Sequence, residues 1–157
     1  MNIKSNLNFH VEETDLNITP DFLDNAFSFY DDRILLRGHK ELLSEIEELV
    51  NEVESLVAST FYLAYSDDVL CGLAWAYLKD DVIKIPVFVV QAQFREIGVG
   101  DYLFNTILNS AQFKSAFTFE SGVLPGDKHG KNFFEQHAGK TRKLVVQGII
   151  NDAKTEQ

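Results

Sequence analysis

The sequence predicts an α/β (α+β) fold, with a central mixed, mostly antiparallel sheet flanked by helices. Two observations carry this prediction. Strand-like runs at 60–65, 69–78 and 82–90 follow one another across short polar turns, which is the pattern of a meander. The last of these runs ends at a glycine loop, 93–100, which opens directly into a helical pattern at 102–108. The order is therefore strand, glycine loop, helix.

The front of the chain predicts one strand and two helices. Leu7, Phe9 and Val11 alternate with polar residues, as in a strand with one buried face. Pro20 follows a capping threonine, and the apolar residues after it recur at helical spacing. Residues 42–57 carry an apolar stripe opposite a face of glutamates, so we expect a second amphipathic helix there.

The back of the chain continues the alternation of helix and strand. Its predicted elements are a helix at 99–111, a strand at 115–121, a helix at 127–137 and a last strand at 141–147. Pro86 interrupts the third strand of the meander. Because proline cannot donate to a strand ladder, it predicts a bulge or an edge position there. We expect one domain over 1–150 and a polar tail at 151–157.

Composition narrows the function classes. The chain has 157 residues, and 45% of them are hydrophobic, as expected for a globular domain. No apolar run approaches the ~18 residues of a membrane span, and the first residues lack the pattern of a signal peptide, so we expect a cytoplasmic protein without a membrane partner. The single Cys71 cannot form an internal disulfide, and its apolar surroundings predict a buried, inert thiol.

Charge is unevenly distributed along the chain. The net charge is −10, and residues 1–81 hold 5 basic against 17 acidic side chains, whereas residues 82–157 hold 9 against 7. This asymmetry suits an anionic cofactor on the back half and a cationic acceptor facing the front half, although the acids could equally serve solubility. Nucleic acid is disfavoured as a partner because no basic stripe is available to neutralise phosphates.

The glycine loop is the strongest candidate for a binding site. A loop that delivers free backbone N–H groups to a helix N-terminus can hold phosphate oxygens. Gly98 and Gly100 let the backbone approach such a ligand closely, and Arg95 adds a positive charge at the mouth of the loop. Two glycines before a helix can also be present for turn geometry alone.

Two segments resemble a known family. Residues 90–100, with Arg95-x-x-Gly98-x-Gly100, resemble the acyl-CoA loop of the GCN5-related N-acetyltransferases (GNAT). Residues 126–139 resemble the helix that follows the fifth strand in that family. The resemblance covers roughly 58–147 in detail and the front of the chain by the order of its elements.

The resemblance implies the GNAT-like acyl-CoA N-acyltransferase fold and an activity. The implied reaction is acetyl-CoA-dependent N-acetylation of a primary amine, on a small molecule or a peptide, by direct attack on the thioester. Coenzyme A in its acetyl form would be the co-substrate, and no metal is implied. The implied cofactor-binding residues are Phe88, Val89, Val90, Arg95, Glu96, Ile97, Gly98, Val99, Gly100, Asp127, Lys131 and Phe134, with Lys128 as an alternative to Lys131.

The acid and base of the reaction are less well specified. Phe134 stands where the family often has the tyrosine that protonates the leaving thiolate, and Asp127 stands where an asparagine is common. Tyr102 or water could replace that acid. Glu120 is the first candidate for the general base. His129 and His137 are the further candidates for the base.

Other readings stay open. A catalytically reduced module that binds acyl-CoA, or regulates through it, would keep the loop without the chemistry. A nucleotide site on a Rossmann-like fold is disfavoured by the meander ahead of the loop. No cluster has metal-ligand spacing. A homodimer could form if the strand at 141–147 paired between subunits.

Overall fold

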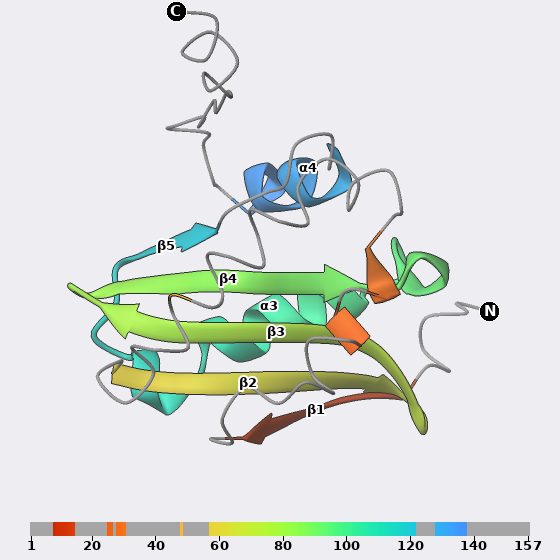
Figure 1. Cartoon of the computed structure of the whole chain (residues 1–157), viewed down its shortest axis with the longest axis horizontal. Helices are drawn as coiled ribbons and strands as arrows, with labels where there is room; N and C mark the ends of the chain where they lie inside the picture. The colour runs from red at the N-terminus through yellow and green to blue at the C-terminus, as the bar shows by residue number, and fades with distance from the viewer. Residues whose placement is uncertain are drawn as a thin grey trace, which may run out of the picture. The chain divides into compact units, whose positions relative to one another are not determined.

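The computed structural model describes residues 8–14, 25–26, 28–30, 48, 57–121 and 128–137. Contacts divide the chain into two units, Met1–Asp127 and Lys128–Gln157. The first unit contains a sheet and helix α3, Val99–Leu108 (Figure 1). The second contains helix α4, Lys128–Gln136. The expectation of a single domain over 1–150 stays a prediction.

The first unit is built on a five-stranded sheet. Its strands are β1 Phe9–Thr14, β2 Val57–Ser66, β3 Val69–Lys79, β4 Val82–Val90 and β5 Thr118–Ser121. They stand in the order β1-β2-β3-β4-β5. The first three pairings are antiparallel and the β4–β5 pairing is parallel. The predicted mixed, mostly antiparallel sheet is therefore confirmed.

The predicted meander is also present, from β2 to β4. Two-residue turns join its strands, at Asp67-Asp68 and at Asp80-Asp81. Asp80 and Asp81 both have positive φ, 53° and 60°. Positive φ at both turn residues matches the right-handed twist of the flanking strands, and aspartate tolerates this conformation better than most residues.

Helix α3 packs against one face of the sheet. Its inward side chains are fully or almost fully buried: Val99, Leu103, Phe104 and Ile107. On β3, Gly72 lies against this helix, because a Cβ built there would be 3.5 Å from Leu103 Cδ2. The helix ends at Leu108, earlier than predicted, because Ser110 adopts an extended conformation. A 3₁₀ turn at Ala111–Phe113 follows, so β5 begins at Thr118 and not at 115.

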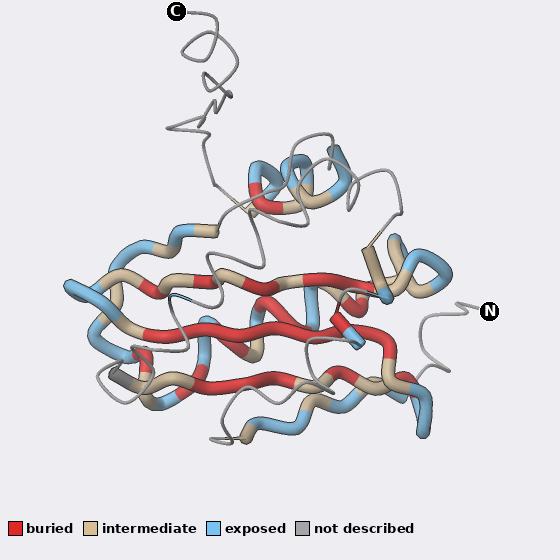
Figure 2. The backbone as a smooth tube through the Cα atoms, viewed as in Figure 1, coloured by how far each residue is buried: buried red, intermediate tan, exposed pale blue. Residues whose placement is uncertain are grey.

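The opposite face of the sheet carries a second apolar cluster. Side chains alternate along a strand, so the residues of β3 that flank Gly72 and Ala74 point away from α3. The buried members of this cluster are Ala26, Phe61, Leu73, Trp75, Tyr77, Val87 and Val89. Ala26 belongs to the segment 25–30, of which the structure describes residues 25, 26 and 28–30. Its described residues are helical up to Phe29, and Phe29 and Tyr30 also pack against this cluster. Figure 2 shows burial concentrated in the central strands of the sheet.

Cys71, on β3, has no exposed surface. Burial raises the pKa of its thiol to about 11, so the reactive thiolate is scarce near neutral pH. The prediction of a buried thiol is confirmed.

Several predicted elements lie outside the described residues. These are most of the acidic helix at 42–57, the last strand at 141–147, the tail at 151–157 and the Leu7 end of the first strand. Of the acidic helix, the structure describes Glu48, which is helical and exposed, and Val57, which begins β2, so the prediction of helix at Val57 was wrong. None of the described helices combines the length and the apolarity that a bilayer crossing requires.

Candidate functional site

The glycine loop joins the end of β4 to the start of α3. Its first residue is anchored to the sheet, because the backbone N–H of Gln91 donates to the Cys71 carbonyl at 2.8 Å. A 3₁₀ turn at Ala92–Phe94 follows. The chain then passes through Glu96, with φ of 65°, and Gly98, with φ of 103°. Two left-handed residues this close together reverse the chain tightly and turn it into the helix.

Gly98 is the N-cap of α3 and supplies no capping side chain. The Tyr102 N–H donates to the Gly98 carbonyl at 3.0 Å and so closes the first turn of the helix. Backbone N–H groups before that position have no carbonyl within the helix to which they could donate. The loop therefore presents amides and the positive end of the helix dipole to an anionic ligand.

The side chain of Arg95 contacts two backbone carbonyls of the protein. Its Nε donates to the Val90 carbonyl at 3.0 Å, and its Nη2 lies 3.5 Å from the Phe29 carbonyl. The role of Arg95 as a cation for a ligand stays a prediction. The guanidinium is directed at backbone carbonyls because the end of β4 and the segment 25–30 both approach it.

β4 contains the irregularity that Pro86 predicted. Trp75 pairs with Val87, but Tyr77, two residues further along β3, pairs with Lys84. Ala76 alone on β3 thus opposes Ile85 and Pro86 on β4, which is the two-against-one count of a bulge. The bulge keeps Lys84 and Val87 on one face although they are three positions apart in the sequence. The prediction of a bulge at Pro86 is confirmed.

The described pairs of β4 and β5 cover the first part of β4. Their parallel register begins at Val82 and ends where Ile85 meets Ser121. Within the described part of the chain, β4 runs on to Val90 beyond its last partner on β5, and β3 pairs with it there. Phe88 and Val89 thus lie between the last described β5 partner and the loop.

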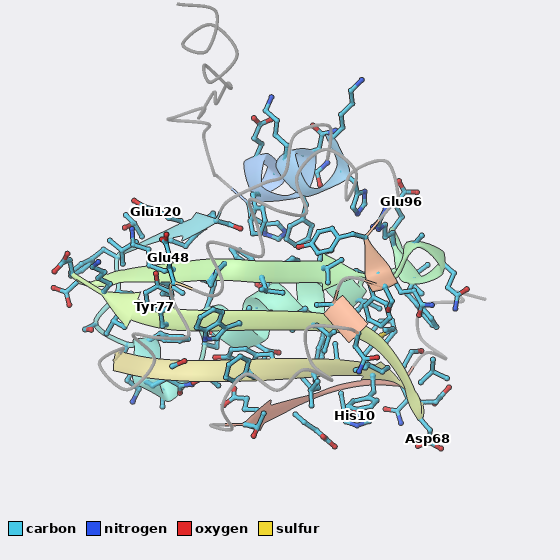
Figure 3. All side chains as sticks on the ribbon, in the orientation of Figure 1. His10, Glu48, Asp68, Tyr77, Glu96 and Glu120 are labelled. Carbon is cyan, nitrogen blue, oxygen red and sulfur yellow. The ribbon has the colours of Figure 1, made fainter. Side chains whose placement is uncertain are left out.

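The base candidate Glu120 lies in β5, one residue before the end of the described part of that strand. It is the register partner of Lys84, whose Nζ donates to its Oε2 across the two strands. The Glu120 side chain is 64% exposed, so solvent screens the pair. Figure 3 shows Glu120 and Glu96 toward opposite ends of the sheet.

Tyr102 lies elsewhere. Its ring meets that of Phe9 edge to face, with centroids 6.3 Å apart, and the residue is 45% exposed. Phe9 belongs to β1, at the edge of the sheet opposite β5. The structure therefore does not bring Tyr102 and Glu120 together.

Helix α4, in the second unit, holds the remaining candidates. Lys131 Nζ lies 3.5 Å from Glu135 Oε1, one turn along an exposed helix face. Phe134 is 8% exposed and edge-on to Phe133, which also contacts His137. His129 is exposed. Asp127 lies outside the described residues.

Sequence reasoning missed two participants. Lys84 is one of many surface lysines in the sequence, and only the parallel register places it beside Glu120. The Phe29 carbonyl is a backbone group, so no residue type in the sequence indicates its contact with Arg95. Among the described residues, no group of three or more His, Cys, Asp and Glu side chains could hold a metal ion.

No protein-family profile matches the sequence, and no curated protein resembles it significantly. Solved structures do match the fold. A candidate acetyltransferase from Pyrococcus furiosus superposes with a TM-score of 0.59 at 18% identity, over 91% of this chain and 100% of that one. A GNAT-family acetyltransferase from Streptococcus pneumoniae gives a TM-score of 0.56 at 15% identity, over 88% and 98%. An aminoglycoside N-acetyltransferase in complex with CoA gives 0.56 at 13% identity, over 91% and 95%.

Proposed function

We propose that this chain, which has the fold of the GCN5-related N-acetyltransferases, is an acetyl-CoA-dependent N-acetyltransferase. The observation that carries the proposal is the continuity of β4, the left-handed loop and the uncapped start of α3. These three parts offer backbone donors along one path, which suits a long ligand with phosphates at one end and a thioester at the other.

The loop residues would hold the pyrophosphate. The backbone N–H groups of the loop and of the first turn of α3 suit its oxygens, because they combine a helix dipole with close backbone approach at Gly98. The residues proposed for this role are Glu96, Ile97, Gly98, Val99 and Gly100. Arg95 would act by holding the loop in shape, since its side chain is directed at carbonyls of the protein.

The end of β4 would orient the pantetheine arm. Phe88, Val89 and Val90 lie beyond the last β5 partner that the structure describes, and we propose that an extended amide chain runs beside them. A backbone donor there would also polarise the acyl carbonyl, whose oxygen gains negative charge when the amine attacks. Lys131 and Phe134, on α4, stay proposals for contacts with the remainder of the coenzyme.

Glu120 is our proposed general base. It lies next to Ser121, the last described residue of β5, and Lys84 holds its carboxylate in place. The amine nitrogen would form its bond to the acyl carbon as the C–S bond breaks, and Glu120 would receive the amine proton directly or through water. Water would return a proton to the thiolate, because Phe134 has none to give and Tyr102 lies against Phe9.

The acceptor is proposed to be a primary amine on a small molecule or a peptide. The excess of acidic residues in the first half of the chain favours an acceptor that carries further positive charge. The aminoglycoside enzyme among the similar structures acts on an acceptor of this chemical kind. A panel of polyamines, aminoglycosides, amino acids and peptides would cover the candidate classes.

Phe134 also favours a second candidate function. A chain without the usual proton donor on α4 could bind acyl-CoA as a sensor or regulatory module and transfer nothing. Tight CoA binding without thiol release on any amine would favour this reading. Robust acetylation of one amine would exclude it.

The test begins with calorimetric titration of the protein with acetyl-CoA and with free CoA. Micromolar binding is expected, and it should be followed by amine-dependent release of free thiol from acetyl-CoA. Glu120→Gln should lower kcat by about tenfold or more and leave KM for acetyl-CoA unchanged, because general-base help is typically worth ~10² or more. Absence of binding in the wild type would contradict both candidate functions.

A further inference from the structure

Arg95 connects two segments that are far apart in the sequence. Its Nε holds the carbonyl of Val90, the last residue of β4, at 3.0 Å. Its Nη2 reaches the carbonyl of Phe29 at 3.5 Å, 66 residues away along the chain. A single rigid guanidinium thus touches the base of the loop and the helical segment 25–30 at the same time.

The Phe29 carbonyl is a suitable acceptor for this contact. Phe29 is the last helical residue of its segment before the bend at Tyr30. Carbonyls at a helix C-terminus have no partner within the helix and carry the negative end of its dipole. A cationic donor placed there acts as a C-terminal cap, so Arg95 stabilises the end of the segment as well as the loop.

The segment also packs over the strand that leads to the loop. Ala26 is 1% exposed and belongs to the same cluster as Val87 and Val89, while Phe29 packs against that cluster. These valines lie on the face of β4 that turns away from α3. The segment 25–30 therefore covers the strand proposed to orient the thioester, on the side of the sheet to which the Lys84–Glu120 pair belongs.

We infer that Arg95 is a positioning residue that couples the acyl-CoA loop to the helical segment 25–30. The inference rests on the proposed function of the loop. A ligand that orders the loop fixes the guanidinium, and the fixed guanidinium holds the C-terminus of the segment. Because such coupling is reciprocal, order in the segment also favours the ligand-binding form of the loop. Bound coenzyme would thereby order the segment 25–30, on the face of the sheet away from α3, before an acceptor binds.

Hydrogen–deuterium exchange with free CoA as the probe tests this coupling. In the wild type, saturating CoA should slow exchange in peptides covering residues 96–101 and also in those covering 25–30, the latter by about fivefold or more. Arg95→Lys keeps the charge but replaces the planar fork with a single ammonium group, so it cannot hold both carbonyls with the same geometry. At saturating CoA it should keep the protection at 96–101 and lose that at 25–30.

Lys114→Gln is the matched control. Lys114 is an exposed residue of the same unit, outside the loop, and its loss changes the charge without touching either segment. It should behave as the wild type. Equal protection of 25–30 in the wild type and in Arg95→Lys would overturn the coupling.

Failure of the proposed function gives a different pattern. If CoA protects neither segment in the wild type, the loop is not the coenzyme site. The coupling is then judged without ligand: Arg95→Lys must speed exchange at 25–30 and at 96–101 together, relative to Lys114→Gln. Acceleration confined to one segment would overturn it. Circular dichroism and thermal unfolding of each variant separate these outcomes from a failure to fold.

Discussion

The two ends of helix α3 satisfy their backbone groups in opposite ways. At the C-terminal end, side chains of the protein fill the available positions. Ser110 Oγ lies 2.8 Å from Tyr62 OH, 3.0 Å from Glu13 Oε1 and 2.8 Å from the Thr106 carbonyl. At the N-terminal end, Gly98 offers no capping group. We call the C-terminal end, at Ser110, the closed end and the N-terminal end, at Gly98, the open end. The closed end contributes to stability, whereas the open end leaves backbone donors for a ligand.

The comparison explains why the same helix can serve both purposes. Buried polar groups must be satisfied, and no buried side-chain polar atom among the described residues lacks a hydrogen-bond partner. At the closed end, Gln112 extends the network to Thr60 Oγ1 at 3.0 Å. The network ties α3 to β1 and β2, so the open end can remain uncapped on a fixed helix.

The largest effect should follow from breaking the closed end. Ser110→Ala removes the 2.8 Å partner of the buried Tyr62 hydroxyl and should lower the free energy of unfolding by about 2 kcal/mol. Urea unfolding measures this change. CoA affinity, from calorimetry, should stay within roughly twofold, because the open end is untouched.

Two controls sharpen this prediction. Ser115→Ala, at an exposed turn, should change the free energy of unfolding by no more than about 0.5 kcal/mol. Adding Tyr62→Phe to Ser110→Ala should cost less than the sum of the single changes, since the two hydroxyls are each other's partners. If Ser110→Ala lowered CoA affinity as well as stability, the proposal that the two ends of α3 serve separate purposes would be contradicted.

The open end was predictable from the sequence because its features are local. A glycine that must adopt positive φ, the strand before it and the helix after it all fall within residues 82–108. The bulge at Pro86 is local in the same sense, because the missing N–H is a property of one residue. Local chemistry of this kind leaves a readable pattern.

The parts that were not predictable depend on register and on long-range contacts. Nothing near Arg95 indicates that its guanidinium meets the carbonyl of Phe29. Nothing near Tyr102 indicates that its ring lies against Phe9 of β1. Likewise, Glu120 lies beside Lys84 because β4 and β5 pair in parallel in one particular register. The hydrophobic pattern of the sequence does not specify that register.

Placing a capping side chain at the N-terminal end of α3 should weaken the binding of CoA. Gly98→Asp places a carboxylate at the helix N-terminus, where it competes with phosphate for the amides and repels it. We expect CoA affinity to fall by at least tenfold, about 1.4 kcal/mol, measured by calorimetry. Gly98→Asn is the matched neutral control, because asparagine also tolerates a positive φ. If the two variants bind CoA equally, charge at this end has no role.

The closed end also predicts a dependence on pH. Burial raises the pKa of Tyr62 to about 12 from its usual 10.0, and the nearby Glu13 carboxylate adds to the effect. A raised pKa means that the folded state binds the proton more tightly, so this stabilisation is complete below pH 10 and is lost as the pH rises toward 12.

The measurement compares the wild type with Tyr62→Phe, which has no proton to lose at this position. The stability advantage of the wild type over the variant should shrink on the order of 1 kcal/mol between pH 9 and pH 11, by urea unfolding. Tyr65, whose pKa burial also raises, is present in both proteins and cancels in the difference. A constant difference across this range would show that the pKa of Tyr62 is the same in the folded and the unfolded state.

The smallest effect tests whether the open end needs one glycine or two. Among the described glycines, positive φ occurs at Gly98, and Gly100 is the second residue of α3 with ordinary helical geometry. Gly100→Ala should therefore raise the free energy of unfolding, by about 0.5 kcal/mol, since alanine loses less backbone entropy in a helix. The CoA affinity of this variant, measured by calorimetry, shows whether Gly100 is needed for binding. Unchanged CoA affinity would assign the binding requirement to the backbone turn at Gly98, whereas a loss of affinity in a more stable variant would mean that the ligand contacts the helix surface at Gly100 itself.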